Sequence, residues 1–340
     1  MTRGNLGSIG SEAAPAQLGN ASYWVDLENL GTRVYSLKST GLDSIARERL
    51  ELVMREIPDG FFRYAVFGAQ GVLMRPESFV DSYDSELGSY ASQYDGSLGY
   101  ADEAGNVGSN EDIIVATNAE IHGNATPGPD GIVDLSAPQS YVSGSTEPAK
   151  EIINLPAINV PPIPSAGPWS LKSKSATLPS GDYHYSSLDL SSGASLTIVG
   201  PARVVLDNFQ LRSNTTLSVD TSAGPVQIFA TGNLQLESNS NLVTNSSRPR
   251  DMAFFISADD SKKPTPIVDF SAQSNYVGLI YAPSAEVSFS ANFAVYGSVM
   301  GREVTMGANS AVHYDSSLLF DDTNGPPEFE TVSWRPIAHQ

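Results

Sequence analysis

The sequence predicts an all-β protein: a parallel β-helix, or β-solenoid, with a small antiparallel hairpin region at the N-terminus. Two observations support this fold class, a repeat of short alternating segments and a composition low in charge. Of the 340 residues, 40% are hydrophobic and only 17% are charged. Such a composition suits stacked coils with polar, uncharged corners, and it does not suit a helical enzyme.

The repeat lies between residues 187 and 256. Each of its three units opens with an apolar-polar-apolar triplet, and a second alternating segment follows after the same interval of 8 (188 to 196, 209 to 217, 234 to 242). Ser, Asn, Gly and Thr separate the segments, as expected of tight turns. Regular self-similarity indicates stacked coils, so Leu188, Phe209 and Leu234 should share one core column. An antiparallel sandwich is the alternative, but hairpin signals are nearly absent from this stretch.

The chain divides into four expected segments. Residues 1–20 hold few large apolar side chains and are predicted to be a disordered leader. Residues 21–60 are predicted to form an N-terminal β-hairpin segment, in which alternating apolar residues over 45–57 favour a third strand over a helix. The solenoid domain is expected over 61–320, and residues 321–340 are expected to form a C-terminal tail that caps or docks.

Prolines interrupt the strand pattern between residues 137 and 169. Because proline cannot donate a hydrogen bond to a β-ladder, this stretch is predicted to be an extended crossing segment. Its Ile and Val residues suggest that it packs along the side of the solenoid. The prolines concerned are Pro156, Pro161, Pro162, Pro164 and Pro168.

The charge and the cysteine content limit the possible partners and the ways in which the fold can be held. The formal net charge is −19, so the backbone of a nucleic acid would be repelled. There is no Cys, so burial and hydrogen bonding alone must hold the fold. No apolar run has the length needed to span a membrane. We interpret the dispersed acidic excess as solubility in a salty or extracellular setting, and a cation-binding surface is the alternative.

A polar loop region over 78–108, rich in Asp, Ser, Tyr and Gly, is the candidate binding site. Loops of this length in a compact domain usually carry function. Tyrosine supplies contact area at low entropic cost together with a polar tip, which suits adhesion. The alternative is that some of these tyrosines cover the end of the solenoid. The predicted binding residues are Asp81, Tyr83, Asp84, Tyr90 and Tyr94.

Calcium is the one cofactor that the sequence suggests. Asp81 and Asp84 could supply oxygen ligands, which calcium prefers, or they could satisfy the backbone of a turn. No other cofactor is expected, because the four histidines, His122, His184, His313 and His339, lack metal-ligand spacing. The sequence has no nucleophile elbow and no phosphate loop either.

Two other functions remain open at this point. Parallel β-helix enzymes that act on polysaccharides use clustered carboxylates, but Asp189, Asp207 and Asp220 do not occupy equivalent positions in the repeat. A protein that binds ice or a crystal surface needs a flat face of regularly spaced hydroxyls. Thr197 and Ser218 are equivalent in the repeat, and the third unit has no matching residue.

Several stretches of the chain resemble a bacterial surface domain. They are Val80–Ser85 with Gly88–Tyr90, Gly105–Ser109, Ala119–Asn124, Gly278–Pro283, Tyr296–Val299 and Val312–Asp315. The domain belongs to pilus-assembly proteins of the PilX type, and the likeness covers about residues 21–320. It implies a surface-exposed, non-enzymatic β-solenoid on a pilin-like N-terminal anchor, similar in rhythm to ice-binding solenoids. The leader and hydrophobic helix of such proteins are missing here, so we expect the anchor to have been removed.

The sequence therefore predicts a non-enzymatic structural or adhesive module, associated with a type IV pilus or the bacterial envelope, that projects the Tyr-, Asp- and Ser-rich loop. Its expected partners are other pilus or envelope proteins, or surface glycans. A membrane would be reached only through an anchor absent from this chain.

Overall fold

A computed structural model describes residues 10–31, 33–56, 61–257, 268–270, 275–320 and 329–337. The chain forms two compact units, one of residues 62–318 and the other of residues 1–61 together with 319–340. The larger unit is a parallel β-solenoid, and the smaller is a five-stranded antiparallel sheet. The predicted fold class is confirmed.

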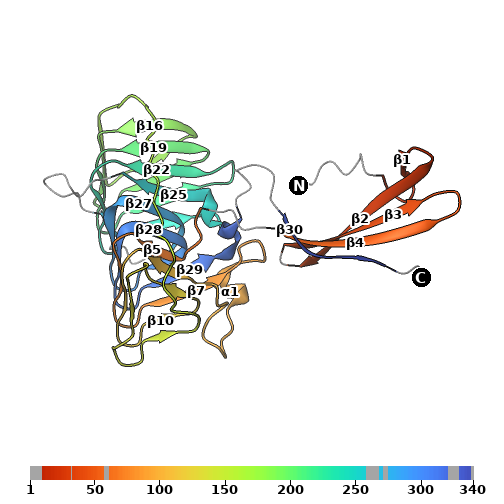
Figure 1. The fold of residues 1–340 in the computed structure, drawn as a ribbon. Coiled ribbons are helices and arrows are strands. Elements are labelled where there is room, and N and C mark those ends of the chain that lie inside the picture. Colours follow the sequence, from red (N-terminus) through yellow and green to blue (C-terminus); the bar gives the residue numbers. More distant parts are fainter. Residues whose placement is uncertain are drawn as a thin grey trace. The chain divides into compact units, whose positions relative to one another are not determined.

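The repeat forms three regular coils, each with three short strands. Corresponding strands pair in parallel, and the core column is confirmed because Leu188 pairs with Phe209 and Phe209 pairs with Leu234. All three side chains are buried. The strands of these coils, stacked in the upper part of Figure 1, are β17 (Ser187–Ser191), β18 (Ser195–Val199), β19 (Ala202–Leu206), β20 (Phe209–Leu211), β21 (Thr216–Asp220), β22 (Val226–Ala230), β23 (Leu234–Leu236), β24 (Asn241–Thr244) and β25 (Met252–Ile256).

One corner of the solenoid is built from residues in the left-handed backbone region. Asn214 and Asn239 have φ of 61°, and Asn309 has φ of 54°. Asparagine tolerates this conformation better than most residues, which explains its recurrence at the turns. A hydroxyl residue follows each turn and closes it, as where Ser240 donates to the Glu237 carbonyl at 2.6 Å and Ser310 donates to the Gly307 carbonyl at 2.7 Å.

The chain joins the stack in its middle. It first builds coils toward one end with β5 (Val66–Gly68), β6 (Val72–Met74), β7 (Phe79–Tyr83), β8 (Val107–Ser109), β9 (Ile113–Val115), β10 (Glu120–Ile121), β11 (Ala125–Thr126), β12 (Val133–Asp134) and β13 (Tyr141–Val142). After the crossing segment it starts again at the other end with β14 (Pro168–Lys172), β15 (Ser175–Leu178) and β16 (Gly181–Tyr185). It finishes with β26 (Val268–Phe270), β27 (Asn275–Phe289), β28 (Ala294–Met306) and β29 (Ala311–Asp315). There β28 pairs with β5 and β6, and β29 pairs with β7, so the two runs of coils form one stack (Figure 1).

The proline-rich segment crosses between the two ends along the solenoid, as predicted, but the predicted range 137–169 is too long at both ends. Tyr141 and Val142 form β13, and Pro168 opens β14. Proline is tolerated as the first residue of a strand, where it interrupts no inner part of the ladder. Ile153, Leu155 and Ile158 pack against the buried cluster of Phe67, Tyr281 and Met300. Polar contacts add to this packing. The side chain of Asn110 accepts from the Ile153 N–H at 2.7 Å and donates to the Ile153 carbonyl at 2.8 Å.

His184 pins the end of the crossing segment to the solenoid. Its Nδ1 lies 2.7 Å from the Ile163 carbonyl and its Nε2 lies 3.0 Å from the Asp207 carboxylate. Burial alone would lower the pKa of His184, but these two contacts outweigh it and raise the pKa above its ordinary value of 6.5. Both ring nitrogens face acceptors, so the contacts favour the imidazolium form.

The smaller unit joins both ends of the chain in one sheet. Its strands, in spatial order, are β1 (Ala16–Leu18), β2 (Ala21–Gly31), β3 (Val34–Leu42), β4 (Arg47–Glu56) and β30 (Phe329–Pro336). The predicted third strand is confirmed as β4. The sheet is reinforced where Arg335 reaches Glu51 at 2.8 Å.

This sheet bears on the two predicted terminal segments. The prediction of a disordered leader over 1–20 is wrong in part, because β1 pairs with β2, while residues 1–9 lie outside the described part. The C-terminal tail docks, because β30 pairs antiparallel with β4. Backbone pairing across the whole length of the chain overrides the polar and proline-rich composition of both termini. Within the described ranges, no helix is both long and apolar enough to cross a membrane.

Candidate functional site

The predicted loop begins later than expected and folds back onto the solenoid. Residues 79–83 form β7, and the loop proper spans 84–104 with one helical turn, α1 (Tyr90–Gln93). Gln93 closes the loop on itself: its amide donates to the Asp84 carbonyl at 2.8 Å and accepts from the Asp84 N–H at 3.0 Å. The predicted 78–108 loop is therefore too long, because β7 and β8 take residues from its two ends.

Asp81 anchors this fold-back. It is fully buried on β7, opposite His313 on β29, and its Oδ1 lies 2.6 Å from His313 Nδ1. Its Oδ2 accepts from the Tyr90 hydroxyl at 2.7 Å and from the Ala101 N–H at 3.1 Å. A buried carboxylate is stable only when its oxygens are satisfied, and here His313 satisfies one oxygen and the loop satisfies the other.

The predicted tyrosines differ in their exposure. Tyr83 is 2% exposed and contacts Tyr90 edge-on, with ring centroids 5.8 Å apart. Tyr90 in turn lies against His313, with centroids 4.0 Å apart. Burial, followed by the charge of Asp81, raises the pKa of Tyr90 far above its ordinary range, so its hydroxyl stays a donor. Tyr94 is 46% exposed and can meet a partner.

Asp81 and Asp84 have different surroundings. Asp84 accepts from the Glu86 N–H at 2.8 Å, a contact typical of an Asp that closes a turn. Calcium at Asp81 would have to displace the contacts of that side chain to His313, Tyr90 and Ala101. Among the residues that the structure describes, no three His, Asp or Glu side chains gather as a metal site. Calcium binding remains a prediction.

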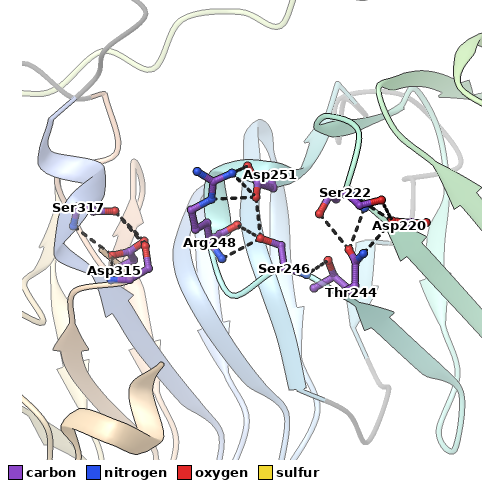
Figure 2. A network of polar contacts seen from close by, with 11 residues as sticks. Asp220, Ser222, Thr244, Ser246, Arg248, Asp251, Asp315 and Ser317 are labelled. Atoms are coloured by element: carbon purple, nitrogen blue, oxygen red, sulfur yellow. Dashed lines mark hydrogen bonds and ion pairs between the residues drawn. The ribbon is translucent and has the colours of Figure 1, made fainter. Parts of the chain in front are cut away.

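A second buried carboxylate, Asp315, holds the start of the loop and was not predicted from the sequence. Its Oδ1 accepts from the N–H groups of Ser85 at 2.9 Å and Ser317 at 3.1 Å. Its Oδ2 accepts from the hydroxyls of the same two serines at 2.6 and 2.8 Å. Arg250 donates to the Ser317 carbonyl at 3.0 Å. Figure 2 shows Asp315 and Ser317 within this network.

Polar networks of the same kind close the turns of neighbouring coils. Asp220 accepts from the Ser222 hydroxyl at 2.6 Å, and Asp251 accepts from the Ser246 hydroxyl at 2.6 Å (Figure 2). Arg248 also pairs with Asp251, at 3.1 Å. These carboxylates accept hydrogen bonds within the turns. At this edge, an Asp with a nearby Ser in the sequence therefore indicates a stabilised turn and not a binding site.

The loop carries an aromatic group that was not predicted either. Tyr100 stacks on His122 with centroids 4.1 Å apart, and Tyr141 lies 5.7 Å from the same imidazole. Glu103 accepts from the Tyr100 hydroxyl at 2.8 Å, and Glu120 lies 3.0 Å from His122 Nε2. We call these five residues the Tyr100 cluster. They come from the loop 84–104, from β10 and the residue that follows it, and from β13, so only the pairing of the coils could reveal them.

The carboxylates considered for glycoside hydrolysis do not share a groove. Asp189 lies on β17 and pairs with Arg212 at 2.9 Å. Asp207 follows β19 and contacts His184, and Asp220 ends β21. The three therefore sit on different sides or corners of a coil. The acid and base of a glycosidase must instead flank one bond.

The hydroxyl face has one more rung than the sequence indicated. In the sheet of β15, β18, β21 and β24, Thr177 pairs with Thr197, and Thr197 pairs with Ser218. In the next strand Val243 takes the equivalent place and ends the column.

Residues 107–319, more than half of the chain, match a family model described as "Domain of unknown function (DUF7305)". The chain belongs to this family. No curated protein matches. The PilX-type resemblance remains a prediction.

Two solved structures are similar to the chain. One is an ice-binding protein from the Antarctic ascomycete Antarctomyces psychrotrophicus, 14% identical, with a TM-score of 0.34 over 75% of this chain and 96% of that chain. The other is the competence-associated pilin ComZ from Thermus thermophilus, 10% identical, with a TM-score of 0.32 over 96% of this chain and 86% of that chain. At these scores neither likeness carries an argument about function.

Proposed function

We propose that the chain is a non-enzymatic extracellular module of a pilus or envelope assembly, and that loop 84–104 is its adhesive contact surface. One observation carries the proposal. The loop is held by buried hydrogen bonds, yet Leu87 is 77% exposed, Leu98 59% and Tyr94 46%. Large apolar side chains held out to solvent on an ordered loop mark an interaction surface.

Pre-organisation is the physical advantage of this arrangement. Asp81, Gln93 and Asp315 fix the loop before any partner arrives. Binding then costs less conformational entropy than it would with a free loop. The solenoid supplies the rigid support, as scaffolds of binding loops generally do. Association with a pilus rests on the resemblance to PilX-type proteins, and the expected partners are pilus or envelope proteins or surface glycans.

The test is binding of the purified protein to an array of glycans and bacterial surface proteins, with and without calcium. The informative variant combines Leu87→Ser, Tyr94→Ser and Leu98→Ser, which leaves the buried anchors in place. The matched control combines Ile114→Ser and Val243→Ser, two apolar side chains exposed elsewhere on the solenoid.

We expect the loop variant to lose array binding and the control variant to keep it. Equal binding by both variants would refute the proposed contact surface. Binding that needs calcium, and that Asp84→Asn abolishes, would support the predicted calcium ligand.

A surface-binding function is the second candidate, favoured by the column of Thr177, Thr197 and Ser218. Hydroxyls one strand apart repeat about every 4.8 Å, a spacing that an ordered surface could match. The test is inhibition of ice recrystallisation by the wild-type protein and by Thr197→Lys. Activity that this variant abolishes would support the candidate, and inactive wild-type protein would dismiss it.

A further inference from the structure

We infer that the Tyr100 cluster docks a basic polypeptide segment, through an Arg or Lys side chain of another surface protein. The inference rests on the proposed function and names the chemistry of its partner. It starts from the distribution of charge. Between Arg75 and Lys150 the chain has thirteen Asp and Glu residues and no Lys or Arg. This stretch builds β7 to β13 together with the loop, so one end of the solenoid is strongly acidic.

The cluster supplies aromatic faces within that acidic region. Tyr141 is 47% exposed, and the side chain of His122 beneath the Tyr100 ring is 8% exposed. His122 Nδ1 is buried and has no hydrogen-bonding partner among the described residues. Leu98, on the same loop as Tyr100, adds an exposed apolar side chain. A partner must therefore bring both apolar contact and positive charge.

Carboxylates beside these rings favour a cation over any other ligand. Glu103 and Glu120 each touch one member of the Tyr100–His122 stack, and both remain accessible, with the Glu120 side chain 45% exposed. A cation over a tyrosine face is attracted by the ring quadrupole, and adjacent carboxylates strengthen the attraction. No basic residue of this stretch competes for the place. The surrounding negative field would also speed the encounter with a basic partner.

The probe is a synthetic peptide of four Arg-Gly-Tyr repeats, and its control is the same peptide with citrulline in place of Arg. Binding is measured by calorimetry at low and high salt. The informative variants are Glu103→Gln with Glu120→Gln, and separately Tyr141→Leu, which keeps apolar area but removes the ring. The matched control is Glu286→Gln with Glu303→Gln, in the other run of coils. Thermal unfolding checks that every variant folds.

We expect the Arg peptide to bind and the citrulline peptide to fail. Removal of the two carboxylates should weaken binding about tenfold, because each exposed ion pair contributes a factor of roughly two to five. Tyr141→Leu should weaken it about threefold, and high salt should weaken it for the wild type. Binding of the citrulline peptide, no binding of the Arg peptide, or equal losses in the informative and control double variants would each overturn the inference. The loop variant on the array tests the proposed function separately, so the two can fail independently.

Discussion

Asp315→Ala tests whether buried carboxylates hold the binding loop on the solenoid. Asp315 is fully buried and accepts four hydrogen bonds, two from N–H groups and two from hydroxyls. In the alanine variant the hydroxyls of Ser85 and Ser317 can turn toward each other, because they lie 3.3 Å apart. Their two N–H groups cannot turn and stay buried without an acceptor.

The cost follows from those two stranded donors. Each buried, unsatisfied N–H costs about 1–3 kcal/mol, so the alanine variant should lose about 4 kcal/mol in the free energy of unfolding. For a unit of this size, about 1 kcal/mol lowers Tm by roughly 2–4 °C, so Tm should fall by about 10 °C.

Asp315→Asn is the matched control. Both N–H groups bond to Oδ1, which Asn keeps, and the new amide can donate to the two hydroxyl oxygens. We expect Asn to cost about 1 kcal/mol.

Calorimetry gives Tm, and hydrogen exchange of peptides from 84–104 shows whether the loop opens before the solenoid unfolds. Equal stability of the Ala and Asn variants, or an alanine loss below about 1 kcal/mol, would refute the assignment of Asp315 as the anchor.

Three further predictions concern other contacts. Because the pKa of His184 is raised in the folded state, its contact with Asp207 stabilises the fold fully below pH 6.5, and this stabilisation is lost as pH rises through the folded-state pKa. The free energy of unfolding of the wild type and of His184→Gln is measured by urea unfolding from pH 5.5 to 9, and the difference between them should shrink as pH rises. A difference that stays constant with pH would contradict the prediction. Asn110→Ala should cost about 2 kcal/mol and speed proteolysis of the crossing segment, because the Ile153 N–H loses its acceptor; an unchanged cleavage rate would count against that role. Asn214 has a left-handed φ of 61°, which glycine adopts freely and alanine does not. In urea unfolding, Asn214→Gly should leave the free energy of unfolding nearly unchanged, and Asn214→Ala should lower it by about 1 kcal/mol. Equal losses in the two variants would contradict this reasoning.

Local pattern was enough to predict the strands of the regular coils. Leu188, Phe209 and Leu234 alternate with polar residues and recur at a nearly constant interval, so their stacking followed from the sequence. The corner asparagines were equally visible, because Asn214 and Asn239 occupy the same place in successive turns.

The site depends on contacts that no local pattern records. Asp81 was predicted as a loop ligand, but its partner His313 lies 232 residues away. Asp315 reaches Ser85 across 230 residues. Such pairs exist only because the two runs of coils meet where β7 pairs with β29. The strands β10 to β13 have two residues each, too few for the sequence to predict how the first run of coils is stacked. Tyr83 and Tyr90 pack against the solenoid for the same reason, whereas Tyr94 stays exposed.

The meeting of the two runs of coils has a consequence for biosynthesis. The ribosome releases β5 to β13 first. On one edge, β5 and β6 pair with β8 and β9, but on the other edge they pair with β28, which is made more than 200 residues later. Until β28 and β29 emerge, one edge of the first coils has backbone groups without their final partners, and such edges readily pair with other chains. Contacts of such long sequence separation also slow folding. A chain that stalls before β28 should therefore be an aggregation hazard, and chaperones that shield strand edges should matter most for this protein late in its synthesis.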